Sequence, residues 1–319
     1  MRKVLVDTDT GIDDALALLV VLSAPEAEVV GIGPTYGNCG SAQAAQNALY
    51  VLEVAGDLTL PVARHVPEPP SAKALIDWAA PVHGRDGLGE CGFRPRRSKT
   101  SNEDAVEQLL RVSRDSGGAT DLLALGPLTN LAAALRVDSK VLYRFRSVTV
   151  MGSMGPQQQS EEVEAAYPAF KGVGDPNTRH DPEAAGAVAG TEANITWVGM
   201  NVTGRLLFPM AMLDDLARRG NPKASFIQAT HRFYSAFVTR SSNSPEPVFT
   251  AHDTVAAVVM LSPTEAVESV QATASLTFDA DGRGSVWGTA PAARRTVHRF
   301  ITNVRPQEVD KRIRTALGA

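Results

Sequence analysis

The sequence has little cysteine and no long hydrophobic run, and each absence excludes a class of protein. Only 2 of the 319 residues are cysteine, Cys39 and Cys91, and neither belongs to a CxxC pair. Without a disulfide framework, we expect a reduced, cytoplasmic protein. The longest apolar stretch, residues 15–22, is too short to cross a bilayer, and no signal-peptide pattern opens the chain. We therefore expect no membrane partner.

The sequence also lacks an excess of basic charge. Its 31 basic and 35 acidic residues give a formal net charge of −4. The short basic run at 94–99 is interpreted as a solvated loop, so no nucleic-acid partner is expected. An apolar fraction of 44% suits an ordinary globular core.

The sequence does contain an unusual group of carboxylates near its start. Four aspartates lie within the stretch 7–14: Asp7, Asp9, Asp13 and Asp14. The apolar run 4–6 before them predicts a buried strand, and the run 15–22 after them predicts a helix. The carboxylates therefore fall between the carboxyl end of a strand and the first turn of a helix. In open α/β sheets this is the edge at which ligands bind.

Two interpretations of the aspartates have to be compared. Helix capping explains Asp13 or Asp14, because free backbone N–H groups and the helix dipole attract anions. Capping does not explain Asp7 and Asp9, which alternate on the strand side. Four like charges so close repel one another, and a hard divalent cation with oxygen ligands would neutralise them. The cluster favours a metal site.

The order of predicted elements indicates an α/β fold. Predicted strands cover residues 4–6, 28–33, 121–125, 147–151 and 196–198. Predicted helices cover residues 15–22, 41–55, 103–114, 128–135, 210–240, 252–261 and 307–317. Ser41 is the predicted N-cap of the second, and the fifth is broken near 220–222. Asp181 and Pro182 begin one more predicted helix. We expect one domain over 1–319, a mainly parallel open sheet flanked by helices with a Rossmann-like core. Residues 275–300, with a turn at 282–284, predict a small C-terminal antiparallel extension, and 61–95 reads as a long Pro- and Gly-rich loop.

The unusual polar groups of the sequence follow predicted strands. The aspartates follow the first strand, Asn38 follows the second, and the dipeptides 125–126 and 151–152 follow the next two. Because the carboxyl ends of parallel strands share one edge, we expect these groups to converge. Further along, His252-Asp253 opens a helix and Asp175-Pro176-Asn177 precedes one. Taken alone, both motifs are typical of helix caps or turns. Beside a carboxylate-rich site, His252-Asp253 could supply a metal ligand and a proton donor. Asp175 and Asn177 could there hold neighbouring hydroxyl groups.

Taken together, these residues resemble the inosine-uridine family of nucleoside hydrolases. The stretch 7–14 looks like the DxDxGxDD signature of that family, in which four acids and a glycine recur at fixed spacing. Further stretches match in the same order, namely Gly37-Asn38, His83-Gly84 with Gly87-Leu88, residues 125–130, Met151-Gly152, Asn177 before residues 181–185, and His252-Asp253. The resemblance runs from residue 3 to about residue 260 and fades in the C-terminal strands.

The resemblance implies hydrolysis of the N-glycosidic bond of a ribonucleoside to free base and ribose, in nucleoside salvage. By resemblance, Ca²⁺ is bound by four groups: the carboxylates of Asp9, Asp14 and Asp253 and the backbone carbonyl of Leu125. Asp7 supports the site from beside it, and Asp13 is the general base for water. The family also implies a homodimer or homotetramer. Oxygen ligands alone would suit Mg²⁺ as well.

The remaining roles concern the two ends of the substrate. Asn38, Asp175 and Asn177 are expected to hold the ribose, where carboxylates stabilise an oxocarbenium-like state. His252 is the first candidate for the acid that meets the leaving base, and His83 is expected in the base-binding wall. Phe233, Tyr234 and His231 could line the base pocket, although their helical spacing favours the core.

The sequence departs from the family on the ribose side. Glu-Phe-Asn is usual where this chain has Asp175-Pro176-Asn177, so the acid is one methylene shorter and an aromatic wall is missing. The segment 153–174 looks longer than usual, and no asparagine matches the one expected at the 5′-hydroxyl. The base preference, purine or pyrimidine, stays open, and a non-standard nucleoside is an alternative substrate.

Two other functions are compatible with parts of the sequence. A haloacid-dehalogenase-like phosphatase also begins with two aspartates after a strand, but it needs Thr or Val where this chain has Gly11 and lacks the pair Asp13-Asp14. A non-catalytic nucleoside- or sugar-binding protein on the same fold would fit the altered ribose contacts. The retained Asp13 argues against it.

Overall fold

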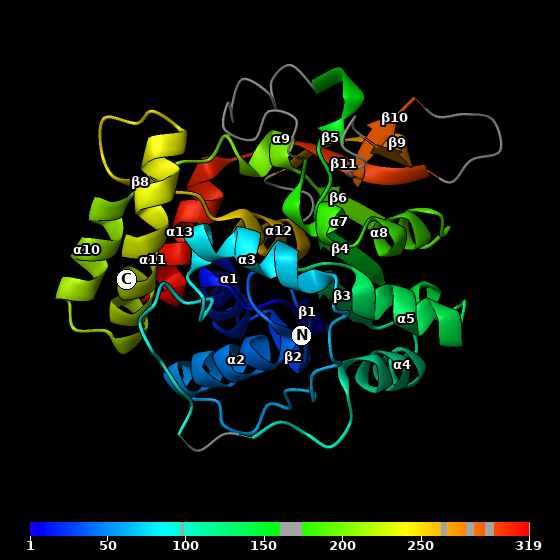
Figure 1. Cartoon of the computed structure of the whole chain (residues 1–319), viewed down its shortest axis with the longest axis horizontal. Helices are drawn as coiled ribbons and strands as arrows, with labels where there is room; N and C mark the ends of the chain where they lie inside the picture. Colours follow the sequence, from blue (N-terminus) through cyan, green and yellow to red (C-terminus); the bar gives the residue numbers. More distant parts are fainter. Residues whose placement is uncertain (97–98, 160–173, 263–266, 279–283, 291–296, 319) are drawn as a thin grey trace.

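A nine-stranded sheet with helices on both faces forms the centre of the protein (Figure 1). The computed structural model describes residues 1–96, 99–159, 174–262, 267–278, 284–290 and 297–318. In spatial order the strands are β2 (Ala27–Pro34), β1 (Arg2–Thr8), β3 (Thr120–Ala124), β4 (Ser147–Met151), β6 (Ile195–Val198), β11 (Val297–Val304), β9 (Val267–Phe278), β10 (Gly284–Thr289) and β5 (Gly155–Pro156). Separately, β7 (Phe208–Pro209) pairs with β8 (Val248–Phe249). The predicted fold class, α/β with a mainly parallel sheet, is confirmed.

The helices form two groups, one on each face of the sheet. One core contains side chains of α1 (Ile12–Leu22), α2 (Ser41–Ala55), α10 (Met210–Arg218), α11 (Pro222–Ser241), α12 (His252–Leu261) and α13 (Pro306–Ala316). The other core contains those of α4 (Ala105–Asp115), α5 (Thr129–Val137) and α8 (Pro182–Ala189). Figure 1 shows α4, α5 and α8 on one side of the sheet and α1, α11 and α13 on the other.

The parallel part of the sheet brings the predicted polar groups to one edge. β1 pairs in parallel with β2 and β3, β3 with β4, and β4 with β6. The carboxyl ends of these strands therefore meet, as the sequence predicted. α1 begins at Ile12, three residues before the predicted apolar run, so Asp13 and Asp14 lie in its first turn.

The C-terminal extension is antiparallel, as predicted. β9 pairs with β10 on one side and with β11 on the other, both antiparallel. β11 joins this unit to the main sheet through a parallel pairing with β6. Of the predicted turn, residues 282 and 283 lie outside the described part of the chain.

Two local expectations were wrong. The stretch 61–95 contains α3 (Ala72–His83), although its prolines and glycines suggested a loop without regular structure. Pro81 lies inside this helix, and only Ala72, Ala79 and His83 are buried, so the apolar pattern is sparse. In addition, the N-cap of α2 is Gly40 and not Ser41. Because α3 is a helix, His83 is held at a helix end.

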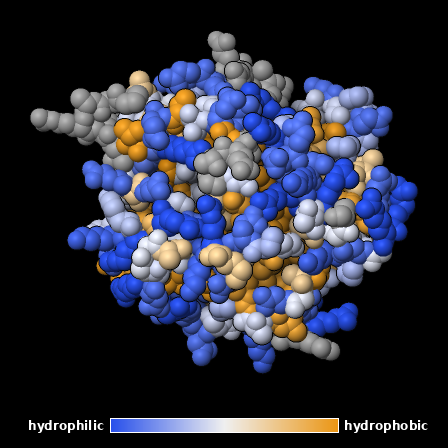
Figure 2. All heavy atoms as spheres, turned by 180° about the vertical axis from the view of Figure 1, so that it is seen from behind, coloured by the Kyte–Doolittle hydropathy of each residue, from blue (hydrophilic) through white to orange (hydrophobic). Residues whose placement is uncertain are grey.

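The face opposite the view of Figure 1 is mainly hydrophilic. Figure 2 shows the rear face, where polar side chains predominate and apolar ones lie in small groups. Among the described residues, no helix combines the length and apolar character needed to cross a membrane.

Candidate active site

A cavity at the carboxyl edge of the parallel strands gathers most of the predicted site residues. Seven of them line it: Asp13, Asn38, His83, Leu125, Asn177, His252 and Asp253. The other lining residues are mostly apolar or aromatic: Trp78, Ala79, Val82, Met151, Pro176, His180, Met200, Tyr234, Phe237, Val238 and Thr250. The floor is therefore acidic and polar, whereas the wall built by α3 and α11 is aromatic.

Asp14 is the aspartate that the capping interpretation describes. Its Oδ2 accepts hydrogen bonds from the backbone N–H of Gly11 at 2.8 Å and from Nδ2 of Asn38 at 2.9 Å. Its Oδ1 accepts one from Oγ1 of Thr8 at 2.5 Å. A Cβ at Gly11 would lie 2.4 Å from Nδ2 of Asn38, so only glycine lets that amide reach Asp14. Asp14 is thus fixed by capping while it faces the other carboxylates.

Asp9 is held by the loop after β2. Its Oδ2 accepts a hydrogen bond from the backbone N–H of Asn38 at 2.7 Å. A Cβ at Gly37 would come 2.0 Å from that oxygen, which explains the glycine in this turn. The second oxygen, Oδ1, is buried without a hydrogen-bond partner. Asp9 therefore keeps one carboxylate oxygen available.

Asp13, Asp14 and Asp253 form the tightest acidic group of the described residues. One carboxylate oxygen from each lies within 4.8 Å of the others. Burial, and next the negative charge of Asp14, raises the pKa of Asp13 to about 8. Burial and then the neighbouring carboxylates hold the pKa values of Asp9 and Asp253 well above the usual range. Proximity of like charges at this cost is typical of cation sites.

Asp7 lies beside the cluster and outside the cavity. Its Oδ2 accepts a hydrogen bond from Nδ2 of Asn130 at 2.8 Å, and burial raises its pKa to about 7. The same Asn130 amide also donates to the carbonyl of Pro34 at 3.1 Å. Asp7 therefore connects the ends of β1 and β2 to α5.

Asn177 connects two strand ends to α7 (Pro176–His180). Its Nδ2 donates to the carbonyl of Leu125 at 2.7 Å and to that of Met151 at 3.1 Å. Leu125 follows β3 and Met151 ends β4. The amide therefore fixes the direction of the Leu125 carbonyl, which is one of the predicted metal ligands.

Asp175 has a different environment from the one expected. Its carboxylate accepts hydrogen bonds from three backbone N–H groups, those of Ser153 at 3.0 Å, Asn177 at 3.3 Å and Thr178 at 2.9 Å. It is the N-cap of α7, so the predicted turn is a short helix. Asp175 is fully buried and is not among the described residues that line the cavity. Its predicted contact with ribose has no support in the cavity lining.

His83 and Tyr234 stand together on the aromatic wall. Their rings stack with centroids 5.6 Å apart, and Nδ1 of His83 lies 3.9 Å from Oδ1 of Asp13. The backbone N–H of Ile12 donates to that Nδ1 at 3.4 Å, which leaves the hydrogen of a neutral ring on Nε2. Burial lowers the pKa of His83 to about 3. Of the three residues offered for the base pocket, only Tyr234 lines the cavity; Phe233 and His231 do not.

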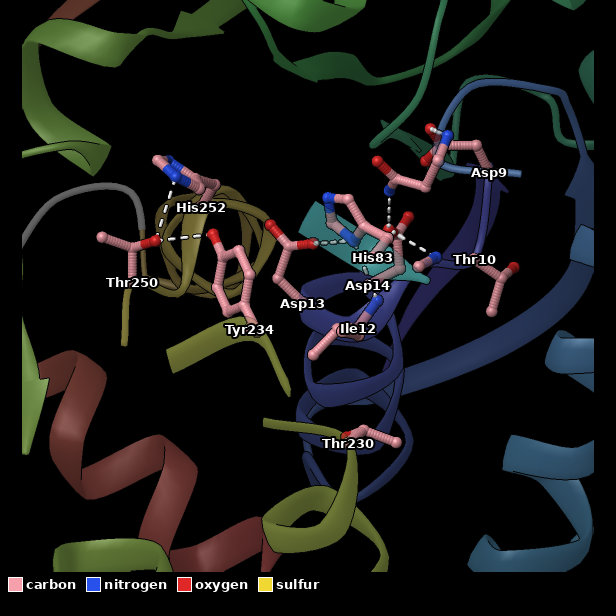
Figure 3. Close-up of polar contacts among 12 residues, drawn as sticks. Asp9, Thr10, Ile12, Asp13, Asp14, His83, Thr230, Tyr234, Thr250 and His252 are labelled. Atoms are coloured by element: carbon pink, nitrogen blue, oxygen red, sulfur yellow. Dashed lines mark hydrogen bonds and ion pairs between the residues drawn. The ribbon is translucent and has the colours of Figure 1, made fainter. Parts of the chain in front are cut away.

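His252, which is half-buried, forms hydrogen bonds with a series of buried side chains. Its Nε2 lies 3.1 Å from Oγ1 of Thr250, which lies 2.6 Å from Oη of Tyr234 (Figure 3). Its Nδ1 lies 2.8 Å from Oγ1 of Thr203 in α9 (Met200–Thr203). Burial lowers the pKa of His252 to about 4, so the ring is neutral near pH 7.

The mouth of the cavity contains two rings that the sequence did not single out. Trp78 of α3 meets His180 of α7 edge to face, with centroids 6.0 Å apart. The guanidinium of Arg179 lies 4.8 Å from the centre of the Trp78 ring. Pro176, which stands where the family has an aromatic residue, also lines the cavity, and its carbonyl oxygen lies 2.6 Å from Nδ1 of His180. Trp78 and His180 therefore supply aromatic surface close to Pro176.

Comparison with known proteins identifies the family. The profile described as "Inosine-uridine preferring nucleoside hydrolase" matches residues 4–311. The chain belongs to this family. Among relatives, "Uridine nucleosidase 1" of Arabidopsis thaliana is 34% identical over 270 residues, 82% of this chain and 74% of the relative. The "Inosine-uridine preferring nucleoside hydrolase" of Leishmania major is 29% identical over 265 residues, 82% of this chain and 80% of the relative.

Solved structures give the same result. The chain superposes on the structure titled "Plant nucleoside hydrolase - PpNRh1 enzyme" with a TM-score of 0.86 and 25% identity, covering 100% of this chain and 99% of the other. A purine-preferring ribonucleoside hydrolase from Gardnerella vaginalis shares the fold, with a TM-score of 0.85 and 22% identity. The sequence-based prediction of family and enzyme class is confirmed: the protein is a nucleoside hydrolase, of a family that hydrolyses ribonucleosides.

The acidic floor fits a hard divalent cation. Oδ1 of Asp9 and Oδ1 of Asp13 are buried carboxylate oxygens without hydrogen-bond partners among the described residues. Buried charges of one sign are retained when they coordinate a metal. The donor set of this nucleoside hydrolase consists of oxygens alone, which suits Ca²⁺ or Mg²⁺ and argues against softer metals.

Proposed function

We propose that this nucleoside hydrolase cleaves the N-glycosidic bond of ribonucleosides with a water molecule activated by Asp13 and a divalent cation. The observation that carries the proposal is a pair of buried carboxylate oxygens, Oδ1 of Asp9 and Oδ1 of Asp13, that have no hydrogen-bond partner among the described residues. Asp13 lines the cavity together with His83 and Tyr234. The floor suits a cation and a hydrophilic sugar. The wall suits a planar base.

We assign the cation, Ca²⁺, to Asp9, Asp14, Asp253 and the carbonyl of Leu125. All four residues are buried, and they come from three segments: the junction of β1 and α1, the residue after β3 and the start of α12. When bound, Ca²⁺ supplies positive charge that lowers the pKa of water and neutralises the crowded carboxylates. The choice of Ca²⁺ over Mg²⁺ follows the family resemblance.

Asp13 is assigned as the general base. It lines the cavity and its Oδ1 has no hydrogen-bond partner among the described residues, whereas both oxygens of Asp14 already accept hydrogen bonds, from Thr8, Gly11 and Asn38. Its free Oδ1 can accept the proton of a water molecule that attacks the anomeric carbon of the sugar. Its position beside Asp14 and Asp253 would place the base next to a cation that these two carboxylates would hold.

The ribose is assigned to Asn38 and Asn177, which both line the cavity next to the acidic floor. An oxocarbenium-like state is positively charged, so the carboxylates on this side stabilise it more than the ground state. Asp175 acts indirectly, because it caps α7 and thereby orients Asn177.

The leaving base is assigned to the aromatic wall of the cavity, which α3 and α11 build. The ring of Tyr234 stacks on His83, and its hydroxyl belongs to the hydrogen-bonded chain that includes Thr250 and His252. Hydrogen bonds from this chain to the departing nitrogen compensate the negative charge that develops on the base. His252 is the proposed source of this stabilisation.

The substrate, the cellular location and the oligomeric state are proposed from the relatives, the cysteines and the family resemblance. Uridine is the first substrate to test, because the relatives with 34% identity are named as uridine nucleosidases. We further propose a cytoplasmic role in nucleoside salvage, which two free cysteines support. The homodimer or homotetramer is proposed from the family resemblance alone.

The proposal is tested by measuring ribose and free base released from uridine, cytidine, inosine, guanosine and adenosine. We expect release in equal amounts from at least one ribonucleoside, and loss of release in Asp13→Ala with Ca²⁺ binding retained. No release from any nucleoside, with Ca²⁺ demonstrably bound, would contradict the proposed reaction. Activity that survives in Asp13→Ala would contradict the assignment of the base.

A further inference from the structure

The hydroxyl of Thr203 contacts His252 but does not belong to the cavity lining among the described residues. Oγ1 of Thr203 is 2.8 Å from Nδ1 of His252, and Thr203 is fully buried. Thr203 is not among the described residues that line the cavity, so it does not reach a bound nucleoside. Its influence on the reaction has to pass through the imidazole ring.

The surroundings of Thr203 indicate which way its hydroxyl hydrogen points. Within its hydrogen-bonding range lie Nδ1 of His252 at 2.8 Å and the sulfur of Met200 at 4.0 Å. A thioether is a weak acceptor, and the imidazole nitrogen is both closer and stronger. The hydroxyl therefore donates to Nδ1. A neutral imidazole has one donor and one acceptor nitrogen, so its hydrogen then lies on Nε2.

When the hydrogen of His252 lies on Nε2, each hydrogen bond that links His252, Thr250 and Tyr234 is donated in the direction of the cavity. Nε2–H of His252 donates to Oγ1 of Thr250 at 3.1 Å, and the Thr250 hydroxyl then donates to Oη of Tyr234 at 2.6 Å. Figure 3 shows Thr250 between the other two side chains. Tyr234, whose oxygen already accepts, directs its own hydrogen away from Thr250, and it lines the cavity. With the other tautomer, this chain would present acceptors to the base.

We propose that Thr203 is a positioning residue of the leaving-group side: its hydroxyl fixes the Nε2–H tautomer of His252 and so makes Tyr234 a hydrogen-bond donor to the departing base. The inference rests on the proposed function, because it requires that His252 and Tyr234 act on the leaving group. No proton has to be transferred along the chain; each hydroxyl keeps its hydrogen and the base receives a hydrogen bond.

The test compares two substrates that differ in their need for this hydrogen bond. A nucleoside needs it, whereas the nitrophenolate of 4-nitrophenyl β-D-ribofuranoside leaves as a stable anion. We expect Thr203→Val to lower kcat for the nucleoside relative to kcat for the nitrophenyl riboside by about tenfold, the value of one hydrogen bond. Thr203→Ser should restore the ratio, because it keeps the hydroxyl.

Controls separate positioning from folding. Thr230 is also fully buried, but its hydroxyl donates to the carbonyl of Ile227, so Thr230→Val should keep the wild-type ratio. Thr203→Val added to His252→Ala should cause no further loss in the ratio. A Thr203→Val variant whose kcat ratio for the two substrates equals that of the wild type, whether or not both kcat values fall, would overturn the inference.

Two results separate this inference from the proposed function. If His252→Ala lowers the ratio and Thr203→Val does not, the inference alone is overturned. If His252→Ala leaves the ratio unchanged, the leaving-group role of His252 is wrong and the inference falls with it. Nitrogen-15 spectra of histidine-labelled wild-type protein add a direct check, in which a hydrogen on Nε2 of His252 is expected and a hydrogen on Nδ1 would overturn the proposal.

Discussion

The side-chain amide of Asn177 donates a 2.7 Å hydrogen bond to the backbone carbonyl of Leu125. A residue assigned to the ribose thus orients a carbonyl assigned to the cation. Removing the amide in Asn177→Ala frees that carbonyl to rotate, and we expect Ca²⁺ binding to weaken by about tenfold, as for partners that orient metal ligands in other sites. Isothermal titration with Ca²⁺ measures the change.

Asn194 provides the matched control for this variant. Its Nδ2 also donates to a backbone carbonyl, that of Arg146, at 2.9 Å, but it is exposed and precedes β6 at the opposite edge of the sheet. Asn194→Ala should bind Ca²⁺ as the wild type does. Equal Ca²⁺ affinity in both variants would mean that the Leu125 carbonyl is not a ligand or needs no support.

Asp13 and Asp14 adjoin in sequence but are assigned different tasks. In Asp13→Asn we expect kcat to fall by about a thousandfold, since a general base is lost, with Ca²⁺ binding largely retained. In Asp14→Asn we expect Ca²⁺ binding itself to be lost at concentrations that saturate the wild type. Turnover and calorimetry on the same preparations distinguish the two. Loss of Ca²⁺ binding in Asp13→Asn would make Asp13 a ligand and not the base.

Asp175 is expected to act on stability. Asp175→Ala leaves three backbone N–H groups without their acceptor, so we expect the free energy of unfolding to fall by about 2 kcal/mol. Asp181→Ala is the control, because that N-cap of α8 accepts only one backbone N–H, from Ala184 at 3.0 Å. It should lose less stability. A large rise in KM for Asp175→Ala with unchanged stability would restore the ribose contact predicted from the sequence.

His231 makes stability depend on pH. Burial lowers its pKa in the folded protein to about 3, while an unfolded chain has a pKa of about 6.5. On acidification, the unfolded state therefore binds the proton first. The stability that neutral His231 contributes is fully present above the pKa of the unfolded state and is lost as the pH falls below that value. Between about pH 7.5 and pH 5 this amounts to about 2 kcal/mol.

The variant His231→Leu removes this dependence. Denaturant unfolding at both pH values should show a smaller loss of stability on acidification in the variant than in the wild type, whatever the absolute stabilities are. His231 does not line the cavity, so the comparison is independent of the acidic site. An identical loss in both proteins would show that His231 has the same pKa in the folded and the unfolded state.

The parts of the site that lie at strand ends could be predicted from the sequence. Val4-Leu5-Val6 and the apolar run after Asp14 define β1 and α1, and parallel pairing brings Asn38 and Leu125 to the same edge without further information. The prediction depends on periodicity and topology, which short sequence windows contain. It was also correct for Asp181 as the N-cap of α8.

The parts that depend on packing between distant helices could not be predicted. Tyr234 has the spacing of a core residue on α11, and only the approach of α3, seen in the stacking with His83, shows that it faces the cavity. Thr203 and Thr250 carry no sequence signal, since threonine is common in cores and turns. α3 was missed because Pro81 and the flanking glycines outweighed its few buried positions.

The central claim is metal-assisted hydrolysis of a ribonucleoside at the acidic floor of this cavity. The most direct measurement is ribose release from uridine before and after removal of divalent cations with a chelator, followed by addition of Ca²⁺ or Mg²⁺ in excess. Release should stop on chelation and return with Ca²⁺, and Asp14→Asn should not be rescued by the same addition. Undiminished release from the fully chelated protein would contradict this claim.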